Sequence, residues 1–129
     1  MTPLHAPRLH YRQSFYYFQF PWPISFNAYK HGIHTTKRGR IWRENAVSTV
    51  LATCGGRPTA LIGRVGLWFE VYPPNDRRKR DLDNTVGKHF WDMLQKAGVL
   101  SDDAQVTESH VYRCEKVAKG CVLVHAVEL

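Results

Sequence analysis

The segment that most constrains the fold runs from Leu61 to Tyr72 and is followed at once by two prolines. Its apolar residues alternate at Val65, Leu67 and Phe69, which is the period of a β-strand with one buried face. Proline has no backbone N–H to donate to a sheet, so Pro73-Pro74 ends the strand. The chain is therefore expected to build a sheet with a covered face.

Two other segments have the spacing of helices. Apolar residues from Ile41 to Leu51 recur three and four positions apart until a pair of glycines, Gly55-Gly56, ends the pattern. A second apolar face runs from Val86 to Ala97 and stops at a glycine. We predict one helix from Ile41 to the glycine pair and another from about Asn84 to Ala97.

The remaining apolar segments have strand character. Ser14–Phe20 is rich in aromatic residues, and 106–115 and 121–128 alternate on either side of a short turn, which is typical of a hairpin. The basic segment 27–40 has no such period and is predicted to be a loop. The predicted fold is α+β in two layers: a mixed β-sheet packed against two helices, in the order β-α-β-α-β-β.

Composition narrows the functions that the chain can have. The 129 residues suit one domain, which we place at 14–129, after an N-terminal extension of residues 1–13. A net charge of +7 favours a polyanionic partner, although charge alone is a weak signal. No apolar run approaches the ~20 residues of a membrane helix, and no secretory leader is visible, so we expect no membrane association and a reducing compartment.

The segment with the clearest chemistry is 76–84, which reads DRRKRDLDN. In an extended backbone Asp81 and Asp83 point to the same side, so they can share one cation. Carboxylates without neighbouring sulfur or imidazole ligands select Mg²⁺, or Mn²⁺ as a substitute. Beside four cations that can hold phosphate, such a site fits metal-assisted phosphodiester hydrolysis. The alternative is that these aspartates only neutralise the arginines or cap a helix.

A second acidic group, Asp102-Asp103, follows the second predicted helix. That helix would be ~20 Å long, whereas the return from Gly98 to Asp103 spans at most ~17 Å. Spacing therefore leaves open whether Asp103 reaches Asp83, and a solvated turn is the alternative for the second pair.

These motifs resemble the RusA-type Holliday junction resolvases. The resemblance rests on DRRKRDLDN, on KAGVLSDDAQV, on FPWPISFNAYKH and on the helix start WRENAV, and it extends over roughly Phe20 to Val127. It implies a RusA-like nuclease domain in a homodimer that needs Mg²⁺ and places paired symmetric nicks across a four-way DNA junction. No small-molecule cofactor is implied.

The resemblance also implies roles for individual residues. Asp81, Asp83 and Asp103 match the family's metal-binding and catalytic acids, and Arg80 matches a basic residue that contacts the substrate. The family lysine lies three residues after the asparagine of DxDN, where this chain has Gly87, and the nearest lysine is Lys88. One inserted residue would account for the shift, so Lys88 is the expected catalytic lysine. The alternatives are that Lys88 is an ordinary solvated lysine or that Lys96 takes the role.

Other cations are expected to contact DNA phosphates, because phosphate contacts supply most of the affinity for a four-way junction. The expected residues are Arg77, Arg78 and Lys79 in the basic run and Lys30, Lys37, Arg38 and Arg40 in the predicted loop. A solvated loop is the alternative for the second group.

The expected function is Mg²⁺-dependent resolution of four-way DNA junctions in recombination and repair, in the cytoplasm of a bacterium or a phage-infected cell. Two alternatives remain open at this stage. One is a nuclease of the same scaffold that cuts flaps or branches, and the other is a catalytically inactive module that binds junction DNA.

Overall fold

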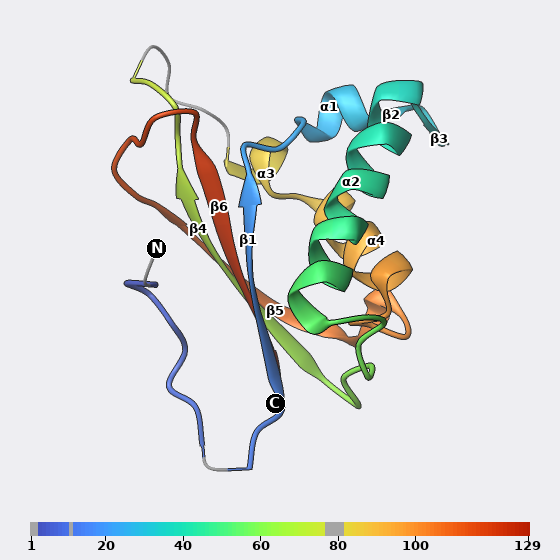
Figure 1. The fold of residues 1–129 in the computed structure, drawn as a ribbon, viewed down its shortest axis with the longest axis vertical. Coiled ribbons are helices and arrows are strands. Elements are labelled where there is room, and N and C mark those ends of the chain that lie inside the picture. The colour runs from blue at the N-terminus through green and yellow to red at the C-terminus, as the bar shows by residue number, and fades with distance from the viewer. Residues whose placement is uncertain (1–2, 11, 77–81) are drawn as a thin grey trace.

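The computed structural model describes residues 3–10, 12–76 and 82–129 and contains one mixed sheet of four strands covered on one face by helices (Figure 1). The strands are β1 (Phe15–Pro21), β4 (Val65–Tyr72), β5 (Val106–Arg113) and β6 (Cys121–Glu128), with a small hairpin of β2 (Lys30–His31) and β3 (His34–Thr35). The helices are α1 (Phe26–Tyr29), α2 (Lys37–Cys54), α3 (Leu82–Thr85), α4 (Lys88–Ala97) and the 3₁₀ turn η1 (Asp103–Gln105).

The predicted two-layer α+β class is confirmed. Every second residue of the central strands points into one core, where the ring of Phe90 from α4 lies 5.5 Å from that of Phe69 and 5.7 Å from that of Phe20. Trp42 of α2 contacts the same ring at 5.2 Å. Packing of α2 and α4 on this face therefore buries the apolar stripes of both helices and of the sheet together.

The predicted hairpin of the last two strands is wrong. The strand order is β1-β6-β4-β5, so β6 pairs antiparallel with β1 and β4, and β5 pairs parallel with β4. The burial of the two strands explains the order. β6 is buried along seven of its eight residues, as a central strand is, whereas β5 is mostly exposed or half-buried and forms an edge.

The helical layer also differs from the prediction in two places. Segment 27–40 is not a plain loop, because it contains the end of α1, the β2–β3 hairpin and the first turn of α2. The second helix is interrupted, so that α3 ends at Thr85 and α4 begins only at Lys88. Within the described residues no helix is long and apolar enough to cross a membrane.

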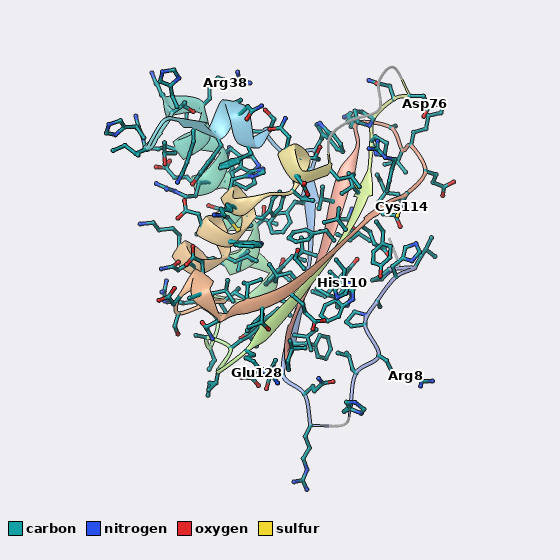
Figure 2. The ribbon with its side chains drawn as sticks, turned by 180° about the vertical axis from the view of Figure 1, so that it is seen from behind. Arg8, Arg38, Asp76, His110, Cys114 and Glu128 are labelled. Atoms are coloured by element: carbon teal, nitrogen blue, oxygen red, sulfur yellow. The ribbon has the colours of Figure 1, made fainter. Side chains whose placement is uncertain are left out.

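The N-terminal segment lies against the sheet face that the helices leave uncovered (Figure 2). Glu70, only 3% exposed, accepts hydrogen bonds from the backbone N–H of Leu4 at 3.1 Å and from that of His5, and from the Tyr72 hydroxyl at 2.9 Å. The ring of His5 stacks on that of Tyr112 at 4.2 Å. One buried carboxylate thus ties residues near the N-terminus to the middle of the sheet.

Replacing this carboxylate by an amide should destabilise the protein. Glu70→Gln turns one acceptor into a donor that faces other donors, so we expect the free energy of unfolding to fall by about 1–3 kcal/mol in urea denaturation. Glu108→Gln is the control, because Glu108 is exposed and pairs with His110 at 3.0 Å, and such exposed pairs contribute about 0–1 kcal/mol. Equal effects of the two changes would contradict the role of Glu70.

Candidate active site

Asp83 lies on α3, where its side chain is exposed to solvent. The next residue fixes the position of α3, because the side-chain oxygen of Asn84 accepts a hydrogen bond from the backbone N–H of Asn27 at 2.9 Å. Asn27 belongs to α1, whose N-terminus is capped by the side chain of Ser25. The proline-rich end of β1 and the DLDN segment, far apart in sequence, therefore meet through one side chain.

The basic run before α3 is not described by the structure. Arg77, Arg78, Lys79, Arg80 and Asp81 all lie outside the described residues, and their proposed roles stay predictions.

The last described residue before this run is Asp76. Its carboxylate pairs with the ammonium of Lys116 at 2.9 Å, which connects the chain just after β4 to the loop before β6.

The break between α3 and α4 depends on Gly87. A methyl group on Gly87 would lie 2.5 Å from the backbone oxygen of Asp83, so only glycine allows the chain to pass this close. The carbonyl of Gly87 then accepts the N–H of Phe90 at 3.0 Å, as the first residue before a helix does. Lys88 is the first residue of α4 and is exposed. The break lies in the interval where the resemblance predicts one inserted residue, and the role of Lys88 stays a prediction.

Asp103 begins η1 and is also exposed, and its backbone N–H donates to the side chain of Gln95 near the end of α4 at 3.2 Å. The preceding Asp102 has a local role, because its carboxylate accepts the N–H of Ala104 at 2.9 Å and caps the turn. Gln105 completes this capping box.

Gln105 also fixes the DDAQ segment to the chain just before β4. Its side-chain amide donates to the backbone oxygens of Leu61 at 2.8 Å and Gly63 at 3.0 Å.

The structure does not bring Asp83 and Asp103 together within one chain. Asp83 follows the end of β4, whereas Asp103 precedes the start of β5, which pairs with Val65 at the beginning of β4. Eight residues of β4 separate these two ends of the sheet by about 23 Å. Figure 1 shows the same arrangement, with α3 near the ends of β1 and β4 and the orange chain after α4 running away from it. Within the described ranges, no three acidic, histidine or cysteine side chains are grouped to hold a metal ion.

A buried histidine, His89, follows Lys88 in the first turn of α4. His89 is 1% exposed, and its ring is surrounded by those of Phe26, Tyr29, Trp42 and Phe90, with centroids 5.1–5.8 Å away. Burial lowers the pKa of His89 to about 4, and the nearby backbone carbonyls oppose this shift without offsetting it. Among the described residues neither ring nitrogen finds a well-formed hydrogen bond. His89 is therefore an uncharged member of the core that joins α1, α2 and α4.

A polar cluster beside His89 was not predicted from the sequence. The hydroxyl of the fully buried Tyr29 donates to the carboxylate of Asp92, and the guanidinium of Arg43 contacts that carboxylate at 3.1 Å and the hydroxyl at 3.2 Å. Burial first, and the bond to Asp92 next, raise the pKa of Tyr29 to about 12. In sequence Asp92 occupies an ordinary polar position of an amphipathic helix, so no pattern distinguishes it. The cluster locks α1 onto α2 and α4.

The cations predicted in the second basic segment lie together around the β2–β3 hairpin and the start of α2. Lys30, Lys37, Arg38 and Arg40 are all exposed. Figure 2 shows Arg38 at the same end of the molecule as Asp76 and opposite Glu128. These cations therefore lie at the end of the sheet that also carries Asp83.

Comparison with known proteins gives the family. The model of the family described as endodeoxyribonuclease RusA matches residues 24–124. This chain belongs to the RusA family. Relatives include the crossover junction endodeoxyribonucleases RusA of Enterobacteria phage 82 and of Escherichia coli K12, each 36% identical over 109 residues, which cover 81% of this chain and 87% of the relative. A RusA of Aquifex aeolicus is 45% identical over 51 residues, 39% of either chain.

These relatives come from a phage and from bacteria, and they confirm the resemblance drawn from the motifs. The matched region contains Asp83, Lys88 and Asp103. No comparison tests the roles of these residues, which therefore stay predictions.

The buried histidine predicts that this RusA family member loses stability in acid. Between pH 6.5 and 4 the unfolded chain protonates His89 and the folded chain does not, so lowering the pH favours unfolding by up to about 1.4 kcal/mol per pH unit. We expect His89→Leu to reduce this slope in urea unfolding measured from pH 7 to pH 4.5. His31→Gln, at an exposed hairpin position, should leave the slope unchanged, and an unchanged slope in His89→Leu would contradict the assignment.

Proposed function

We propose that this RusA family protein is a Holliday junction resolvase: a Mg²⁺-dependent endodeoxyribonuclease that nicks four-way DNA junctions at paired, symmetric positions. The observation that carries the proposal is the match of four-fifths of the chain to proteins named crossover junction endodeoxyribonucleases. The net charge of +7 and the exposed cations at the Asp83 end of the sheet support a DNA substrate. Residues 14–129 would form the nuclease domain, working in the cytoplasm of a bacterium or phage-infected cell.

The distance between the acids determines how a metal site could be built. Asp81 and Asp83 would supply carboxylates from one chain, but Asp103 of that chain lies toward the other end of the sheet. We therefore propose a homodimer in which Asp103 of the partner subunit completes each site. Exposed carboxylates fit the all-oxygen ligand set that Mg²⁺ prefers. When bound, Mg²⁺ would polarise the scissile phosphate and lower the pKa of a water molecule.

The remaining residues would bind and orient the DNA. Arg80 and Lys88 would hold the scissile phosphate and balance the negative charge that develops on its oxygens. The other predicted cations would contact the phosphate backbone on either side, which recognises the shape of a junction more than its sequence. The exposed side chain of Lys88 at the start of α4 is free of the core and therefore able to reach a phosphate.

The first experiment is cleavage of a synthetic four-way junction beside a flap and a plain duplex. We expect paired nicks in the junction with Mg²⁺ and no cleavage with EDTA, because the phosphate needs the metal to be polarised. Faster cleavage of the flap would favour a branch nuclease of the same scaffold. Tight junction binding without a nick in any lane would show an inactive binding module and overturn the proposal.

Mixing two inactive variants tests the shared metal site. Asp83→Asn and Asp103→Asn homodimers should each lose nicking by about 100-fold or more, because each site lacks one metal ligand. In a mixed dimer, one of the two sites regains Asp83 from one chain and Asp103 from the other. Equal mixtures, unfolded and refolded together, should therefore recover nicks in one strand of the junction.

The control is Asp83→Asn refolded with a second Asp83→Asn preparation that carries a different tag, which should stay inactive. If each chain built its own site, no mixture of the two variants would contain a complete one. Absence of recovery, with mixed dimers verified by tag pulldown, would overturn the shared site and leave the resolvase assignment to the cleavage experiment.

A further inference from the structure

The tip of the β2–β3 hairpin carries an apolar side chain, Ile33, that is exposed to solvent. Ile33 is 88% exposed, the highest value among the large apolar residues of the described chain. It sits in a two-residue turn after Gly32, whose positive φ of 62° permits this tight reversal. Nothing within the described chain covers Ile33, so its side chain is available to contact a partner.

The surroundings of Ile33 indicate the chemistry of that partner. Six exposed basic or histidine side chains lie on the hairpin and the first turn of α2: Lys30, His31, His34, Lys37, Arg38 and Arg40. The sequence from residue 27 to residue 43 contains no aspartate or glutamate. An apolar tip within a uniformly cationic surface is complementary to nucleic acid, where phosphates surround apolar base faces.

The hairpin is held firmly at its base. The hydroxyl of Thr36 donates to the backbone oxygen of Ala28 at 2.6 Å, and its backbone N–H donates to that of Tyr29 at 2.9 Å. Gly39 of α2 approaches so closely that a methyl group there would lie 2.5 Å from the same oxygen of Tyr29. The side chain of Tyr29 is in turn hydrogen-bonded to Asp92. The base of the hairpin is therefore fixed to α1 and α2, and the position of Ile33 relative to these helices is defined.

The hairpin is connected to the candidate site through α1, which lies between the hairpin and α3 (Figure 1). It follows α1 directly, and α1 is tied to α3 by the hydrogen bond between Asn27 and Asn84, one residue after Asp83. The two strands of the hairpin have two residues each, so Ile33 projects only about 7–10 Å from the end of α1. DNA whose phosphate lies at Asp83 would therefore pass within reach of Ile33.

We propose that Ile33 is a wedge that enters between base pairs at the branch point of the junction, while the hairpin cations hold the flanking phosphates. Stacking is already interrupted at a branch point, so a side chain can separate bases there at a smaller cost than within a duplex. This inference rests on the proposed resolvase function and adds a residue that selects branched DNA. None of the acids of the metal site takes part in it.

The test places 2-aminopurine, whose fluorescence rises when it unstacks, beside the branch point of a junction kept in EDTA. We expect wild-type protein to raise the signal by about twofold or more, and Ile33→Ser to remove the rise, while affinity in low salt changes by less than about threefold because phosphate contacts remain. Ile62→Ser is the matched control, since Ile62 is 79% exposed in the loop before β4, at the other end of the sheet.

A rise that is equal in Ile33→Ser, or absent in the wild type, would overturn the wedge. An unchanged melting temperature of Ile33→Ser verifies that the exposed substitution leaves the fold intact. Nicking by the wild type in Mg²⁺ is measured in parallel. If it is present and the wedge signal is absent, only this inference fails, whereas its absence shows that the proposed function itself is wrong.

Discussion

The parallel pairing of β4 with β5 is the constraint on which the rest of this structure depends. Two parallel neighbours cannot be joined by a tight turn, so the chain must cross from the end of β4 back to the level where β4 began. The crossover consists of α3, α4 and η1, and every candidate acid lies on it or directly before it. The layer that covers the sheet and the segment that carries the chemistry are therefore one piece of chain.

The anchoring of this crossover is uneven along its length, in a way that suits the proposed function. Its middle is held by the rings around His89 and by the Asp92 cluster. At its ends, side-chain amides fix the backbone and leave the carboxylates exposed: Asn84 holds α3 to α1, and Gln105 holds η1 to the start of β4. Rigid backbone with exposed acids is what an active site for a large polyanion needs, because little ordering remains to be done when the substrate binds.

The sequence predicted those parts of the fold that depend on local pattern. Strand β6 was predicted at its observed bounds, and α2 ends at Gly55 as expected, because period and helix-ending glycines are local signals. Pairing is not local. The final two strands were wrongly joined because nearness in sequence was taken for nearness in the sheet.

The break before α4 was hidden for a different reason. Val86 is buried in the same core as Phe90 and continues the apolar period across the interruption, so the pattern alone reads as one helix. Only the spacing between Asn84 and Lys88 hinted at an extra residue. The motifs indicate candidate acids, but the ends of the sheet at which these acids lie follow from strand order.

Because the acids are separated along the crossover, the proposed arrangement makes DNA cleavage depend on dimer formation. A single chain would present its cations and bind DNA through phosphate contacts, yet it would hold an incomplete set of metal ligands and leave the backbone intact. Two chains related by a twofold axis would complete two sites at the same moment. A four-way junction is resolved only when two of its strands are cut. An enzyme whose active sites form only in pairs would therefore avoid the single nicks that a catalytically active monomer would make in duplex DNA.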